Sequence, residues 1–284
     1  MNIIRSTIII PVAALLLSGC ATPQRSEYAA FAQAGSGYAA AVDKLLVAAG
    51  EAQVDSTSWT LVGDKNDGGI DEATYKKRTQ EDIDRLTELR RLRTHAQLLG
   101  NYFVQLEVLA TSDAPDRAKS AIKGVVKSIT DLSLSSSEAL PALPTLGRGI
   151  VDANIRAALK EELTSERKEV LRKELQLQKV LLTQLSGQIA VALKEAKQIK
   201  EFDLVITPLI AGGSPLVKPE NWVAKRHEVM YMSETVEELK LAATAACKMQ
   251  VTFDALLSGE DVTGSINSLI IDIERILTIA EAIN

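Results

Sequence analysis

Apolar residues recur at alternating intervals of three and four along most of this chain, and this spacing constrains the fold more than any other feature. In a helix such positions form one continuous stripe, the seam pattern of helices packed side by side. No stretch alternates with period two for long enough to predict a strand. The six predicted seams run over residues 31–52, 89–110, 118–132, 171–199, 232–253 and 262–283.

Two of the predicted helices are unusually long. One runs over about 71–112 and the other over about 150–206, which at 1.5 Å per residue gives lengths of roughly 60 and 85 Å. Helices of this length need partners along their whole length. The sequence therefore predicts an all-α fold, an elongated antiparallel helical bundle with long coiled-coil-like helices. The longer helix either runs without interruption or breaks near Ser186 and Gly187, and the sequence leaves both alternatives open.

Glycine, proline and acidic residues punctuate the pattern. The segment 63–69 separates the first two predicted helices, and Ser258 and Gly259 end the fifth. Loops rich in proline and glycine are predicted over 141–149 and 208–219.

A single helical-bundle domain is predicted over residues 28–284. Within it, residues 103–106 and 253–256 are similar, and each precedes a turn with an acid and then a short helix. This favours two long-long-short helical units, 28–138 and 150–284, but heptad sequences also resemble one another by chance, so duplication stays open.

The composition and motifs argue against nucleic-acid binding and against catalysis. The net charge is −5, which is not the electrostatic footprint of a nucleic-acid-binding protein. His227 and Glu228 begin like a zinc-protease motif, but Tyr231 stands where the second histidine is required. The acidic loop that starts at Asp64 has Tyr75 where a calcium loop needs glutamate. We therefore expect no enzyme activity, no metal and no cofactor.

The first twenty residues form a leader. Arg5 gives a positive start, residues 8–17 form an apolar core too short to span a bilayer, and Leu17-Ser18-Gly19-Cys20 follows. This order resembles the lipobox of bacterial lipoproteins. The resemblance implies cleavage of residues 1–19, lipidation of Cys20 with palmitate-like acyl chains, and attachment to the membrane through Cys20. Residues 20–27 are expected to form a lipidated polar tether.

The same resemblance indicates a location. Ala21 stands where many inner-membrane lipoproteins carry aspartate, so the outer membrane is favoured, with the protein facing the periplasm. If Cys20 carries lipid, Cys247 has no partner for a disulfide within the chain, and it is expected to be a small buried apolar residue.

Two loops are the best candidates for docking another molecule, because apolar side chains interrupt their proline and glycine residues. Such side chains either cap the bundle or bind a partner. Two glutamines that interrupt apolar seams are candidate register residues, or else lie exposed at a bundle end. The loop candidates are Leu140, Leu143, Leu146, Leu209, Ile210, Leu216 and Val217, and the register candidates are Gln178 and Gln250.

These features predict a non-catalytic, lipid-anchored envelope protein that binds an unidentified envelope protein, as a scaffold, assembly, exclusion or immunity factor. The alternative is a periplasmic bundle that binds a small molecule or lipid. Seams rich in alanine and glycine, such as Gly35, Ala49, Ala52 and Ala192, would leave room for an internal ligand, or else let helix backbones approach closely.

Overall fold

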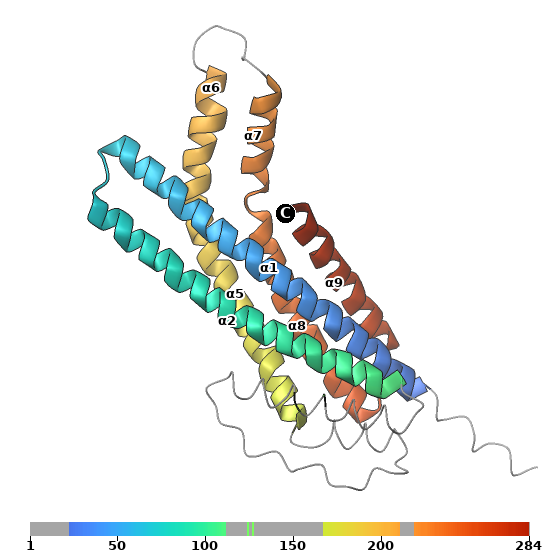
Figure 1. Cartoon of the computed structure of the whole chain (residues 1–284). Coiled ribbons are helices and arrows are strands. Elements are labelled where there is room, and N and C mark those ends of the chain that lie inside the picture. Colours follow the sequence, from blue (N-terminus) through green and yellow to red (C-terminus); the bar gives the residue numbers. More distant parts are fainter. Residues whose placement is uncertain (1–22, 112–123, 125–126, 128–166, 211–218, 284) are drawn as a thin grey trace, which may run out of the picture.

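The computed structural model describes residues 23–111, 124, 127, 167–210 and 219–283 (Figure 1). These residues are almost entirely helical and contain no strand, which confirms the predicted all-α bundle. The elements in chain order are α1 (Pro23–Asp67), α2 (Glu72–Thr111), α5 (Arg167–Glu201), the π-helix η1 (Phe202–Ile206), α6 (Thr207–Ile210), α7 (Pro219–Tyr231), α8 (Glu234–Ser258) and α9 (Thr263–Ile283).

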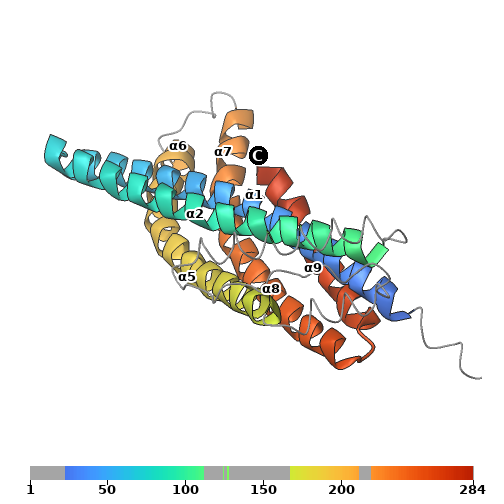
Figure 2. The same ribbon diagram turned by 60° about the horizontal axis from the view of Figure 1, so that its bottom comes forward.

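Helix α1 lies at the centre of the bundle. It has 45 residues, and α2, α5, α8 and α9 all pack against it. Figure 2 shows α1 and α2 running together on one side of α5 and α8. At 1.5 Å per residue, α1 is roughly 68 Å long, so the bundle is elongated as expected. It begins at Pro23, inside the segment 20–27 that the sequence predicted as a tether.

Aromatic side chains fill the core near the beginning of α1. Phe31 stacks on Phe253 of α8 with ring centroids 5.7 Å apart, and it meets Phe103 of α2 edge-to-face at the same distance. Tyr102 packs against Phe103 at 5.3 Å. All four rings are buried, and such pairs stabilise a core beyond the burial of their area. Three helices are therefore joined at this point.

The turn between α1 and α2 follows from its glycines and an aspartate. Helix α1 continues through Gly63, past its predicted end, and stops before Gly68 and Gly69. Gly69 has φ +96°, which favours glycine, and its N–H donates to the Asp64 carbonyl at 3.2 Å. The Asp71 carboxylate accepts from the Thr74 N–H at 2.7 Å, which caps α2.

The turn between α8 and α9 also combines a glycine of positive φ with a capping aspartate. Gly259 has φ +78° and donates its N–H to the Leu256 carbonyl, while Asp261 accepts from the Thr263 N–H at 3.0 Å. The predicted end of the helix at Ser258 and Gly259 is confirmed.

Helix α5 shows no break at Ser186 and Gly187. The Ser186 hydroxyl donates to the Thr183 carbonyl at 2.8 Å, so its polar group is satisfied inside the helix. The helical path continues through η1 and α6 to Ile210, past the predicted start of the loop at 208. The sequence also failed to predict α7, which begins at Pro219, the last residue of the predicted loop, and forms a separate helix before α8. Pro219 suits the first position of a helix.

Several predictions fall outside the described residues. These are the leader, the loop over 141–149 and most of the helix over 118–132, within which Gly124 and Lys127 are helical. The comparison between the units 28–138 and 150–284 stays a prediction for the same reason.

Gly35 allows α1 and α2 to approach closely, so we expect Gly35→Ala to be destabilising. An added Cβ would lie 2.5 Å from the buried Phe103 ring, and overpacking of this kind costs about 1–3 kcal/mol. Gly187 is the matched control, because no atom lies within 4 Å of a Cβ there, and Gly187→Ala should stabilise the helix by up to about 1 kcal/mol. Urea unfolding measured by circular dichroism compares the two variants. Equal effects of the two substitutions would contradict the close packing.

Candidate functional site

Helices α6 and α7, with η1, form a projection that we call the arm (residues 202–210 and 219–231). Figure 1 shows the arm extending from the bundle at the end opposite to the beginning of α1. The Trp222 Nε1–H donates to the Val205 carbonyl at 2.9 Å, which holds α7 against η1. Val205 and Val229 are buried. The arm is therefore a packed two-helix unit.

The arm exposes an unusual number of large apolar side chains. It holds seven of the seventeen exposed ones in the described part of the chain, although η1 and α6 contribute only nine residues and α7 only thirteen. Clusters of exposed apolar residues mark binding surfaces more often than isolated ones do. The seven are Phe202, Ile206, Leu209, Ile210, Val223, Met230 and Tyr231.

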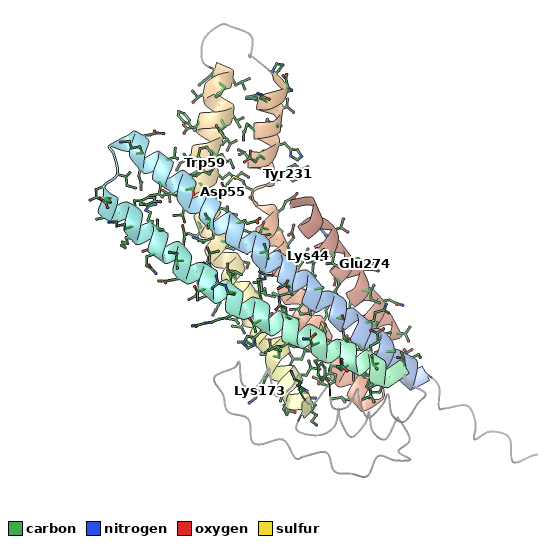
Figure 3. All side chains as sticks on the ribbon, viewed as in Figure 1. Lys44, Asp55, Trp59, Lys173, Tyr231 and Glu274 are labelled. Carbon is green, nitrogen blue, oxygen red and sulfur yellow. The ribbon has the colours of Figure 1, made fainter. Side chains whose placement is uncertain are left out.

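A buried lysine joins the arm to the bundle. Lys200, the last lysine of α5, is 3% exposed, and its Nζ contacts Asp55 of α1 at 3.3 Å and Glu228 of α7 at 2.5 Å. The same Nζ lies 5.3 Å from the centre of the Trp59 ring. Figure 3 shows Asp55 and Trp59 on one stretch of α1 beside the base of the arm. The hydrogen bond from Lys200 lowers the pKa of Glu228, so this ion pair persists well below neutral pH.

A groove of about 1200 Å³ lies between the arm and the bundle. Its walls come from α1, from residues 86–93 of α2, from α7 and from the beginning of α8, with Leu193 and Lys200 contributed by α5. Leu46, Ala48 and Met232 are among its apolar lining residues, whereas Glu51 and Glu234 are charged. The groove is large enough for a small molecule, and its walls mix apolar side chains with polar and charged ones.

The first turns of α8 carry an unusual carboxylate. Glu238 is 1% exposed, and neither of its carboxylate oxygens has a hydrogen-bond partner among the described residues. Burial, with a smaller contribution from the charge of Glu234, raises the pKa of Glu238 to about 7. Glu234 and Thr235, one turn earlier on the same face of α8, line the groove.

A second buried polar cluster joins α2 and α5. The Gln178 Nε2 donates to one oxygen of Glu174 at 2.9 Å, and the other oxygen lies 3.2 Å from the His95 Nδ1. The Tyr38 hydroxyl of α1 is buried without a hydrogen-bond partner in the described chain, and burial followed by the charge of Glu174 raises its pKa. The cluster lies in the seams, so it restricts how α5 can slide along α2.

The two histidines lie in different parts of the structure. His95 belongs to this buried cluster, whereas His227 lies on exposed α7 with its ring 4.1 Å from that of Tyr231. Within the described ranges, no three His, Cys, Asp or Glu side chains are grouped to hold a metal ion. The acidic loop at Asp64 is an interhelical turn, in which Asp64 pairs with Arg78 at 2.6 Å.

The residues that the sequence singled out fall in different places. Leu209 and Ile210 lie on the arm, 58% and 71% exposed. Gln178 is buried, whereas Gln250 is partly exposed. Cys247 is partly exposed too, with its Sγ 3.6 Å from the Lys179 Nζ, so the expectation of a buried cysteine was wrong. Cys20, Leu140, Leu143, Leu146, Leu216 and Val217 lie outside the described residues.

Sequence reasoning missed Lys200, Asp55 and Glu238, and it considered Glu228 only as part of the incomplete zinc-protease motif. The one available signal was Lys200, a charged residue directly after the apolar Ile199 at the end of the α5 seam.

Comparison with known proteins gives no relative: no family model, no curated protein and no solved structure matches the chain. None of the helices in the described ranges is long and apolar enough to cross a membrane.

Glu238 makes the stability depend on pH, and Glu238→Gln should remove this dependence. The folded chain holds the proton of Glu238 up to about pH 7, whereas an unfolded chain releases it near 4.5. The wild type should therefore be most stable, relative to the variant, below pH 4.5, and should lose on the order of 3 kcal/mol or less as the pH rises from 4.5 to 7.

Urea unfolding of both proteins between pH 4 and pH 8, roughly the range over which this carboxyl titrates, measures the difference. The exposed Glu237 is the control, and Glu237→Gln should leave the pH dependence unchanged. Parallel curves for the wild type and Glu238→Gln would contradict the assignment.

Proposed function

We propose that this chain is a lipid-anchored protein of the cell envelope that acts by binding another protein, without catalysis. The observation that carries the proposal is the arm, whose exposed apolar side chains are concentrated on two short helices. The lipobox-like Leu17-Ser18-Gly19-Cys20 supports the anchoring, with the outer membrane favoured and the body in the periplasm.

The arm lies far from the residue that is proposed to carry the lipid. Helix α1 begins only three residues after Cys20, and the arm lies at the other end of the bundle (Figure 1). With lipid on Cys20, the bundle can hold the arm some tens of ångströms from the membrane surface, since α1 alone is roughly 68 Å long. A partner would then meet the arm before it meets the anchor.

The spacing of the exposed residues indicates the kind of partner surface. Phe202, Ile206 and Leu209 are spaced by four and then three residues, and Val223 and Met230 lie seven residues apart, which is about two turns of α7. Such stripes fit an apolar groove or the apolar face of a helix. We expect the partner to cover these exposed side chains and to leave Trp222 in place, so that the packing within the arm is unchanged.

Site-specific photo-cross-linking tests the arm. A photoreactive residue at Leu209 or Ile210 should give a discrete cross-linked protein in intact cells. Val191 is the matched control, because it is 75% exposed but lies on α5 outside the arm. Cross-links of the same size from all three positions, or from Val191 alone, would remove the arm as the docking surface.

Membrane fractionation tests the anchor. The wild type should fractionate with the outer membrane, and Cys20→Ser should be released, because the variant lacks the thiol that accepts the lipid. If Cys20→Ser is found in the same fraction as the wild type, the chain is attached in another way. The cross-linking experiment would still test docking by the arm.

A second candidate function is the binding of a small molecule or lipid in the groove, and the volume of about 1200 Å³ favours it. The small seam residues support it less. Gly35 is packed against Phe103, and Ala49, Ala196 and Ala246 are buried in the core, so these positions serve close helix packing, whereas Ala52 lines the groove.

A further inference from the structure

The arm is joined to the bundle by little apolar packing. Its elements pack mainly against one another and against α5, from which the arm continues. Of the thirteen residues of α7, only Val229 is buried, and the main buried apolar cluster of the described chain contains no residue of the arm. Because packing supplies most of the stability of a helix in a protein, the position of the arm depends on a few groups at its base.

The backbone is irregular at both points where the chain enters and leaves the arm. On the α5 side, η1 is a π-helix, a form that occurs mostly as a single turn and frequently at functional sites. On the α8 side, a two-residue turn of Met232 and Ser233 separates α7 from α8. Ser233 is the N-cap residue of α8, but its hydroxyl makes no capping hydrogen bond. Both segments are suited to act as hinges, because hinge residues lie in short loops or at the ends of elements.

One ion-pair group ties the base of the arm to α1. We call it the latch, and it consists of Lys200, Asp55 and Glu228, with the Lys200 Nζ 3.3 Å from the Asp55 carboxylate and 2.5 Å from that of Glu228. The Lys200 side chain is 3% exposed, whereas those of Asp55 and Glu228 are 50% and 44% exposed. Glu228 also pairs with Lys225, but both belong to α7, so that pair does not join the arm to the bundle.

The lysine is the group that keeps the latch closed. Both carboxylates contact the same Nζ, so they lie close together, and without the positive charge they would repel each other. Each carboxylate is about half exposed, so water can solvate it when the arm moves away from α1. The loss of the lysine charge would therefore release the arm without disturbing the core of the bundle.

We propose that the arm is a hinged element, held against α1 by the latch and released when Lys200 no longer bridges the two carboxylates. The π-helix η1 and the turn before α8 take up the rotation, while the hydrogen bond from Trp222 to the Val205 carbonyl keeps α7 and η1 together. The groove widens in the released position, because α7 forms one of its walls and α1 another. The inference rests on the junction alone, so it is independent of docking by the arm and of ligand binding in the groove.

Distances between spin labels, measured by pulsed electron paramagnetic resonance on the purified full chain, test the hinge. One pair joins Glu220, near the far end of α7, to Ile271 of α9, and a second pair, Val191 of α5 and Ile271, lies within the bundle. All three side chains are exposed. The labels are attached to introduced non-canonical residues, so that Cys20 and Cys247 stay unmodified. Helix α7 is roughly 20 Å long, so a rotation of about 20° would move its far end by roughly 7 Å.

Lys200→Met removes the charge and keeps an apolar side chain in the buried position. We expect the distance from Glu220 to Ile271 to gain a second population, shifted by several ångströms (about the displacement of such a rotation), while the distance within the bundle stays the same. Lys197→Met is the matched control, because Lys197 lies three residues earlier on α5 and has no ion pair among the described residues. This control should give both wild-type distances.

A double variant separates the charge from the packing of the lysine side chain. Lys200→Met combined with Glu228→Gln leaves one carboxylate in place of two, so the repulsion is removed and the released population should be smaller than in Lys200→Met alone. If Lys200→Met does not fold, Asp55→Asn at a half-exposed position breaks the connection to α1 and should release the arm in the same way.

Three outcomes would overturn the latch. The first is an unchanged distance from Glu220 to Ile271 in folded Lys200→Met, or in Asp55→Asn where that variant replaces it. The second is a shift of both distances, which would show a change of the whole bundle. The third is an equal released population in Lys200→Met and the double variant, which would assign the movement to lost packing and not to charge.

Discussion

The structure depends on the burial of α1 along its length. An isolated helix of 45 residues is not stabilised by its own hydrogen bonds alone, and most of its stability comes from packing. Here four helices share that burial: α2 covers one side through close approach at Gly35 and Gly100, and α5, α8 and α9 cover others. With two cysteines in the chain and Cys247 free, packing replaces covalent cross-links.

The seams predicted the helices well because their spacing is local. Phe31, Phe103 and Phe253 lie within three of the predicted seams, 31–52, 89–110 and 232–253, and Phe31 contacts both of the others. The turns at Gly69 and Gly259 could be predicted for the same reason, since a positive φ and a capping aspartate are encoded within a few residues. Helix α7 was missed because its apolar residues point largely to solvent and give no seam, so the Pro and Gly residues before it dominated the prediction.

The candidate sites could be predicted only in part. The apolar character of Leu209 and Ile210 is visible in the sequence, and so is the polar interruption at Gln178. The pairing of Lys200 with Asp55 joins residues 145 positions apart, and nothing local in either segment indicates it. Likewise, Glu238 resembles any other surface glutamate on a charged helix, and only the packing of other helices around it makes it a buried acid.

The π-helix at the base of the arm sets the direction in which α6 leaves the bundle. The Thr207 N–H donates to the Phe202 carbonyl, five residues earlier, so this turn holds one more residue than an α-helical turn. The buried positions at the end of α5, Leu193, Ala196 and Lys200, would continue with α-helical spacing to 203 or 204, whereas the buried residue is Val205. One added residue thus rotates the end of the helix by roughly 100°, and the inward face of the chain is shifted where the arm begins.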